Sequence, residues 1–77
     1  MIKNRTVLKR VCERDVYYVI SSVRDGYRIR VTADNESVSC FVCGDPLAIE
    51  TLYEKICEGE VTPCTLEAVI EDFYGSL

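Results

Sequence analysis

The sequence predicts an α+β domain, in which a four-stranded antiparallel meander is followed by two helices packed on one of its faces (β-β-β-β-α-α). Two observations lead to this fold class. β-branched and aromatic residues dominate up to Val42, with polar turns between them, and apolar residues at helical spacing follow Gly44. The chain has 77 residues, so we expect one domain, residues 1–77, whose small core leaves little room for an internal pocket.

The first two strands are expected at residues 5–12 and 16–24, with a polar turn at Glu13–Asp15 between them. The segment 16–24 (VYYVISSVR) is rich in the β-branched and aromatic residues that favour strands. Apolar side chains fall on both of its faces, so we expect it to sit centrally or in a sheet covered on both sides. One face carries Val16, Tyr18 and Ile20, and the other carries Tyr17, Val19 and Val23.

The next two strands are expected at residues 27–32 and 37–42, with a turn at 34–36. Asp25-Gly26 predicts the preceding hairpin, because glycine allows the positive φ of a tight turn. If Thr32 lies opposite Ser37, one side of this strand pair collects the apolar pairs Val31–Val38, Ile29–Cys40 and Tyr27–Val42. The other side then carries Arg28, Arg30, Ser39 and Phe41.

Both helices are predicted by the same pattern, which is a capping residue, a proline at the first position, an apolar stripe and a final glycine. The first is expected from Asp45 to about Glu58, with the stripe Ile49, Leu52, Tyr53 and Ile56. The second is expected from Thr62 to Gly75, with the stripe Leu66, Val69, Ile70 and Phe73.

Charge is distributed unevenly along the chain. The net charge is −4, but residues 1–31 carry +5 and residues 32–77 carry −9. We therefore expect basic strands and acidic helices, which matters for any partner.

The N-terminal residues MIKNRTVLKR are interrupted by charges and do not resemble a signal peptide. The longest uncharged run, Val16–Val23, is far too short to cross a bilayer. Five cysteines at irregular spacing form a poor disulfide framework and fit free thiols in a reducing compartment. We therefore expect a cytoplasmic protein that makes no membrane contact.

Residue types that support catalysis are scarce. Histidine, the commonest general base and metal ligand, is absent. No serine has an evident base beside it, and Lys55 lies among glutamates that keep it protonated. We therefore expect no catalytic residue, no cofactor and no enzymatic activity.

Cys40 and Cys43 form a C-x-x-C pair that, together with Cys57 and Cys64, is a candidate zinc site. A strand that runs through Val42 points residues 40 and 43 to opposite faces, which does not suit chelation. We therefore interpret the four cysteines as packed thiols and expect no metal site, with zinc as the alternative.

The second face of the sheet is the most informative feature, because two helices can cover only one face of so small a sheet. Apolar side chains are nevertheless expected on the other face, at Tyr17, Val19, Val23 and Phe41. An exposed patch of this kind marks an interface, so we expect an interaction or regulatory domain that forms a homodimer through the sheet. A three-residue turn at 24–26 would instead turn Val16, Tyr18 and Ile20 outward.

A nucleic-acid-binding module is the alternative function. Arg28 and Arg30, with Tyr17 and Phe41 beside them, would supply cations for phosphates and aromatic rings for bases. The net charge of −4 and a pI of about 4.7 argue against it, since such modules are usually basic.

The C-terminal segment, Val61 to Phe73, contains the pattern Pro-x-x-Leu-x-x-Val-Ile-Glu-Asp-Phe. In this it resembles a small family of proteins from Clostridia-like bacteria to which no activity is assigned. The matching positions are Pro63, Leu66, Val69, Ile70, Glu71, Asp72 and Phe73. Ala68 departs from the family pattern, which has an acid there. The resemblance implies a bacterial, cytoplasmic origin and no particular activity.

Overall fold

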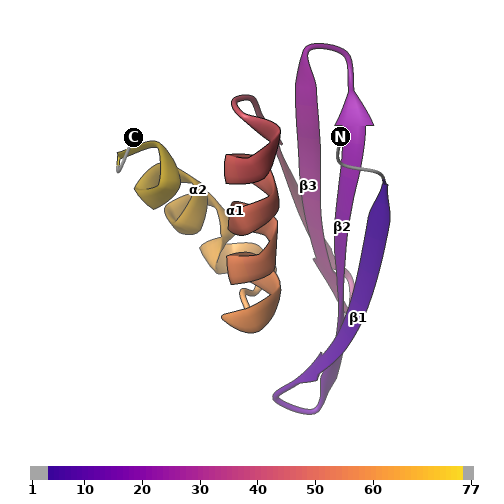
Figure 1. Cartoon of the computed structure of the whole chain (residues 1–77). Coiled ribbons are helices and arrows are strands. Elements are labelled where there is room, and N and C mark those ends of the chain that lie inside the picture. The colour runs from indigo at the N-terminus through magenta and orange to yellow at the C-terminus, as the bar shows by residue number, and fades with distance from the viewer. Residues whose placement is uncertain (1–3, 76–77) are drawn as a thin grey trace.

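The computed structural model describes residues 4–75, and its elements follow the predicted order (Figure 1). One antiparallel sheet, with strand order β1-β2-β3-β4, is formed by β1 (Arg5–Val11), β2 (Arg14–Val23), β3 (Gly26–Ala33) and β4 (Glu36–Val42). The chain continues with α1 (Pro46–Glu58), a 3-10 turn, η1 (Pro63–Thr65), and α2 (Leu66–Gly75). Both helices lie on the same face of the sheet, which confirms the α+β prediction.

The register of β3 and β4 is the predicted one. Thr32 pairs with Ser37, and the apolar pairs Val31–Val38, Ile29–Cys40 and Tyr27–Val42 all face the helices. Because side chains alternate along a strand, a shift of one residue would have exposed this whole apolar set, and burial therefore determines the register.

The turn between β1 and β2 lies earlier than predicted. It consists of Cys12 and Glu13, and β2 already begins at Arg14, which pairs with Val11. The prediction of a turn at Glu13–Asp15 was therefore wrong. Both turn residues have positive φ, 51° and 66°, as the tightest hairpin turns require, although neither is the glycine or asparagine that usually signals them.

Gly26 has a different role from the predicted one. The β2–β3 turn has two residues, Arg24 and Asp25, and the positive φ belongs to Asp25 at 66°. Gly26 is the first residue of β3, and the ring of Phe41 packs on it. A Cβ at this position would lie 2.6 Å from the carbonyl oxygen of Val42 and 2.7 Å from Cζ of Phe41. Glycine is therefore required here for space and not for its backbone freedom.

Two buried tyrosines join the sheet to the helical layer. Tyr18 Oη donates to the carbonyl oxygen of Val61 at 2.9 Å, and Tyr53 Oη donates to the carbonyl oxygen of Tyr18 at 2.7 Å. Burial raises the pKa of both phenols above their ordinary value, so both stay neutral donors at physiological pH. The tyrosines bury large rings without leaving their hydroxyl groups unpaired.

Lys9 explains why a charge interrupts the apolar face of β1. It lies between Val7 and Val11 on the side of the helices, and its Nζ donates to the carbonyl oxygen of Cys57 at 2.8 Å. This carbonyl is in the last turn of α1, where backbone oxygens lack helical partners and attract cations. Lys9 therefore fixes the end of α1 on the edge of the sheet.

The starts of the helices follow the predicted chemistry, with one difference. Asp45 caps α1 by accepting a hydrogen bond from the backbone nitrogen of Leu47 at 3.4 Å. The second helical segment begins at Pro63 as a 3-10 turn, because the backbone nitrogen of Thr65 donates to the carbonyl oxygen of Thr62 at 3.0 Å. Regular α-helix starts at Leu66, three residues after Pro63, which was expected at the first helical position.

Candidate interaction surface

The sheet face that points away from the helices is called the open face here. The hairpin registers place alternate residues of all four strands on it. These are Thr6, Leu8, Arg10, Asp15, Tyr17, Val19, Ser21, Val23, Arg28, Arg30, Thr32, Ser37, Ser39 and Phe41. In Figure 1 no helix covers this side of the sheet.

All four residues expected at an interface lie on the open face. Tyr17 and Phe41 keep 44% and 51% of their surface exposed, while Val19 and Val23 are half-buried. The two-residue turn after Val23 removes the alternative in which Tyr18 would point outward, and Tyr18 is fully buried.

Leu8 belongs to the same surface and was not among the predicted residues. It pairs with Tyr17 across β1 and β2, and 55% of its surface is exposed. Alternation along β1 explains its position, because Val7 and Val11 face the helices and Leu8, one residue after Val7, points to the other side.

The register also fixes how apolar and basic groups are arranged on the open face. Phe41 of β4 lies opposite Arg28 of β3, and Val19 of β2 lies opposite Arg30 of β3. Tyr17 follows two residues from Val19 on the same strand. A diagonal therefore crosses the sheet from Phe41 through Arg30 and Val19 to Tyr17, so that aromatic rings and guanidinium groups lie together on the open face.

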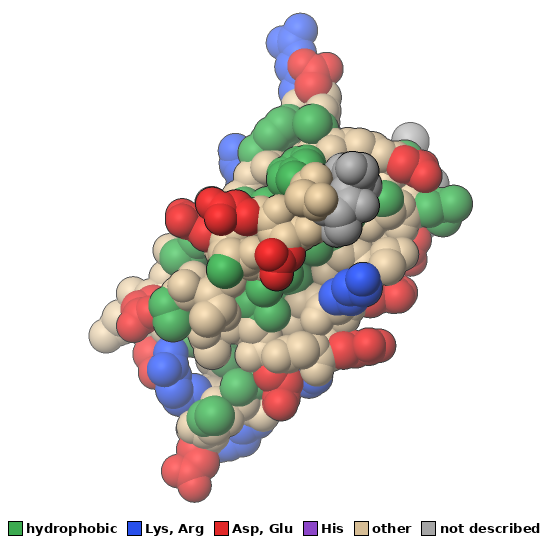
Figure 2. Space-filling view, turned by 90° about the vertical axis from the view of Figure 1, so that its left-hand side faces the viewer, with side chains coloured by type: hydrophobic (Ala, Val, Ile, Leu, Met, Phe, Trp, Pro, Cys, Tyr) green, Lys and Arg blue, Asp and Glu red, His purple; other side chains and the backbone are tan. Residues whose placement is uncertain are grey.

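The two layers of the molecule carry opposite charge. On the open face, Asp15 is paired with Arg10 at 3.6 Å, and neither Arg28 nor Arg30 makes an ion pair with residues 4–75. Carboxylates recur across the helical layer, which Figure 2 views directly. The exposed acids of this layer include Glu54, Glu58, Glu67, Glu71 and Asp72. The open face is therefore the basic surface of an acidic protein.

The cysteines do not gather into a ligand set. Cys40 lies on the helical side of β4, Cys43 is exposed beyond the strand, Cys57 is half-buried on α1 and Cys64 is exposed in η1. Among residues 4–75, no three His, Cys, Asp or Glu side chains are placed to hold a metal ion. Burial raises the pKa of the Cys40 and Cys57 thiols, which disfavours the reactive thiolate.

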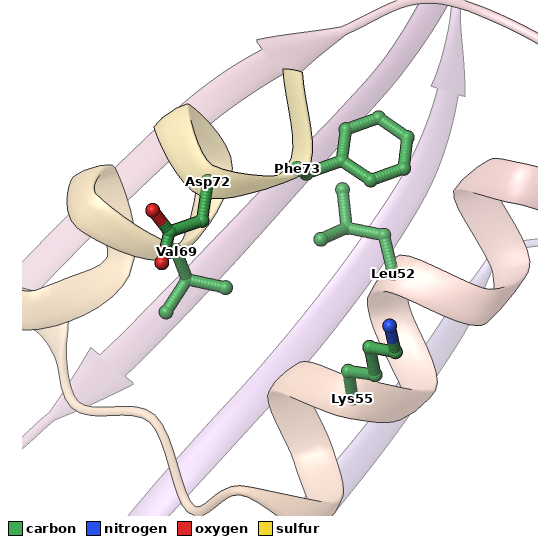
Figure 3. Close-up of a pocket in the computed structure, with 5 residues that line it drawn as sticks. All are labelled: Leu52, Lys55, Val69, Asp72 and Phe73. Carbon is green, nitrogen blue, oxygen red and sulfur yellow. The ribbon is translucent and has the colours of Figure 1, made fainter. Parts of the chain in front are cut away.

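A small cavity lies between the two helices (Figure 3). Leu52 and Lys55 of α1 and Val69, Asp72 and Phe73 of α2 line a space of about 250 Å³. This is below the usual size of a small-molecule site. Its polar lining consists of one lysine and one aspartate, with no nucleophile or second acid for chemistry. The open face is therefore the stronger candidate for function.

No family model, curated protein or solved structure matches this chain. No helix within residues 4–75 has the length and apolar character needed to cross a membrane. The candidate function therefore rests on the geometry and charge of the open face.

Proposed function

We propose that this protein is a non-enzymatic interaction module that self-associates through its open face. The observation that carries the proposal is the exposure of Leu8, Tyr17 and Phe41 on a sheet face that residues 4–75 leave uncovered. Burying such side chains yields roughly 25 cal/mol for each Å² removed from water, which favours a partner surface.

A symmetric pairing of two open faces avoids contact between like charges. A twofold axis parallel to the strands, midway between β2 and β3, sets β2 of one copy against β3 of the other. Val19 then meets Arg30 of the second copy, and Ser21 meets Arg28 of the second copy, because these residues are paired across β2 and β3. The apolar stem of each arginine can cover a valine while its guanidinium group reaches a hydroxyl group.

The test is a charge placed at the centre of this surface. Val19→Arg sets an arginine against Arg30 of the opposing copy at both symmetry-related positions, so the dimer is expected to become a monomer. Leu47→Arg is the matched control, because Leu47 is 72% exposed on α1 and distant from the open face. Native mass spectrometry measures both, and circular dichroism checks folding. A wild-type monomer, or a Val19→Arg dimer as tight as wild type, would contradict the proposal.

A second candidate function is binding of single-stranded nucleic acid. It is favoured by the cross-strand pair of Arg28 and Phe41 and by the lack of an unpaired carboxylate on the open face. Stacking on an aromatic ring contributes about 1–3 kcal/mol per base, and arginines neutralise phosphates. Segregated charge weakens the objection from the negative net charge, because most of the acids lie in the other layer.

The nucleic-acid candidate is tested with the double variant Arg28→Ala/Arg30→Ala. Binding of a labelled single-stranded oligonucleotide, followed by fluorescence anisotropy, is expected to fall at least about tenfold and to lose part of its salt dependence. Arg24→Ala is the control, since Arg24 is an exposed arginine in the β2–β3 turn. Val19→Arg separates the two functions, because it keeps nucleic-acid binding while it breaks self-association. Failure of wild type to bind the oligonucleotide or heparin at low salt excludes this candidate.

A further inference from the structure

The two edges of the sheet are protected very differently. β1 carries Arg5, Lys9 and Arg10, and Lys9 points inward toward α1. Charges on an edge strand, especially inward-pointing ones, are a common device against unwanted strand pairing. The segment 37–43 (SVSCFVC), which comprises β4 after Glu36 and the residue that follows the strand, contains no charge, proline or glycine. It consists largely of residues that favour strands, so β4 is the unprotected edge.

The free hydrogen-bonding groups of β4 follow from the ladder. In a two-residue hairpin the pair that flanks the turn is hydrogen-bonded, and such pairs alternate along the strands. Ala33–Glu36 flanks the β3–β4 turn and is therefore a hydrogen-bonded pair. The even-numbered residues of β4 consequently direct their backbone N–H and C=O groups toward β3. The backbone groups of Ser37, Ser39 and Phe41 point outward, away from the sheet. Cys43, the next odd residue, fits this count, because its backbone nitrogen donates to Tyr74 Oη at 3.1 Å.

We propose that β4 pairs antiparallel with β4 of a second copy, about a twofold axis at Ser39. Tyr74 accepts a hydrogen bond from the outward backbone nitrogen of Cys43. Among the described residues, the outward groups left free on β4 therefore extend from Ser37 to Phe41, a window that is symmetric about Ser39. Pairing about Ser39 sets Ser39 against itself and Ser37 against Phe41. Every outward backbone group of the window then gains a partner. The two sheets become one, with both open faces on the same side.

The side chains that meet at this seam are compatible. Val38 lies opposite Cys40 of the second copy on the helical side, and both are half-buried in the single chain, so they have surface left to bury. Glu67 of α2 is close enough to add to the effect of burial in raising the pKa of the Cys40 thiol. Two copies therefore bring two Glu67 carboxylates near the axis, which limits the affinity and keeps the pairing reversible.

Ser39→Pro tests the pairing, because proline removes the central outward N–H without removing a hydrogen bond to β3. The dissociation constant of the dimer is expected to rise by about 100-fold. Thr6→Pro is the matched control: Thr6 has the equivalent outward position on β1, at the other end of the row Thr6–Val19–Arg30–Ser39. Unchanged dimerisation of Ser39→Pro, or a wild-type monomer in native mass spectrometry, overturns the proposal.

A disulfide trap keeps the proposal testable if Ser39→Pro fails to fold. Val38→Cys faces Cys40 of the second copy in a non-hydrogen-bonded pair, where Cα atoms lie about 4.5 Å apart, within disulfide range. Mild oxidation with diamide is expected to give a covalent dimer whose peptide map joins residues 38 and 40 of different chains. Absence of this cross-link in a dimeric variant overturns the register.

The edge contact is independent of the open-face contact, and the two proposals fail separately. Loss of the dimer in Ser39→Pro but not in Val19→Arg supports the edge and rejects self-association through the open face. The reverse result rejects the edge. A wild-type assembly larger than a dimer that each variant reduces to a dimer supports both contacts. The two twofold axes are perpendicular but do not intersect, since one runs midway between β2 and β3 and the other lies outside β4, so together they generate an open array and not a closed tetramer.

Discussion

Replacing Tyr18 with alanine is expected to lower the free energy of unfolding by about 3–5 kcal/mol, because it empties the largest fully buried site of the central strand. The change also deprives the carbonyl oxygen of Val61 of its donor. A domain of 77 residues has a total stability of about 4–12 kcal/mol. Thermal denaturation is therefore expected to shift down by about 15–30 °C, with partial unfolding already at room temperature.

Tyr17 provides the matched control, since it is the same residue type on the same strand with its side chain on the open face. Tyr17→Ala is expected to change the free energy of unfolding by less than about 1 kcal/mol. Tyr18→Phe keeps the ring and removes only the hydrogen bond to Val61, so about 1–2 kcal/mol should be lost. Equal losses for Tyr17→Ala and Tyr18→Ala would mean that the faces of β2 have been assigned incorrectly.

Gly26→Ala is the second substitution with a large expected effect, although it adds a single methyl group. The new Cβ would lie 2.6 Å from the carbonyl oxygen of Val42, and backbone cannot rotate away as a side chain can. Separation of β3 from β4 at this end is expected to cost about 1–3 kcal/mol, measured by chemical denaturation.

Gly75→Ala is the control for Gly26→Ala, because a Cβ on Gly75 meets no atom of residues 4–75 within 4 Å. Gly75 is the last residue of α2, so alanine there is expected to be neutral or to stabilise by up to about 1 kcal/mol. Adding Phe41→Ala to Gly26→Ala should recover little stability, since the clash with the Val42 backbone persists. A stable Gly26→Ala variant would show that the two strands can separate there without loss.

The features that sequence predicted correctly are those where several local signals agree. The β3–β4 register is determined by three apolar pairs that a one-residue shift would expose. The start of α1 is determined by Asp45 and Pro46 together. The Asp45 side chain accepts a hydrogen bond from a backbone N–H of the first turn, and Pro46 has no backbone N–H that would be left without a partner there. The residues of β2 that lie on the open face follow from the alternation of side chains along the strand, given that the turn after Val23 has two residues.

The features that sequence missed depend on contacts between distant residues. Nothing local indicates that Cys12 and Glu13 adopt positive φ, which the pairing of Val11 with Arg14 imposes. The requirement for glycine at position 26 comes from Phe41 and Val42, which lie about fifteen residues later in the sequence on the adjacent strand β4. The inward charge of Lys9 is explained only when the end of α1 is placed beside β1.

The separation of charge between the two layers gives the whole molecule a permanent electric moment, directed from the acidic helices to the basic open face. Net charge governs how the protein migrates in a field, but this moment governs which side it presents on approach. A negatively charged surface attracts the open face, and a positively charged surface attracts the helices, even though the formal net charge is −4. The protein is therefore oriented by a charged partner before any contact forms. This electrostatic orientation weakens as added salt shortens the screening length.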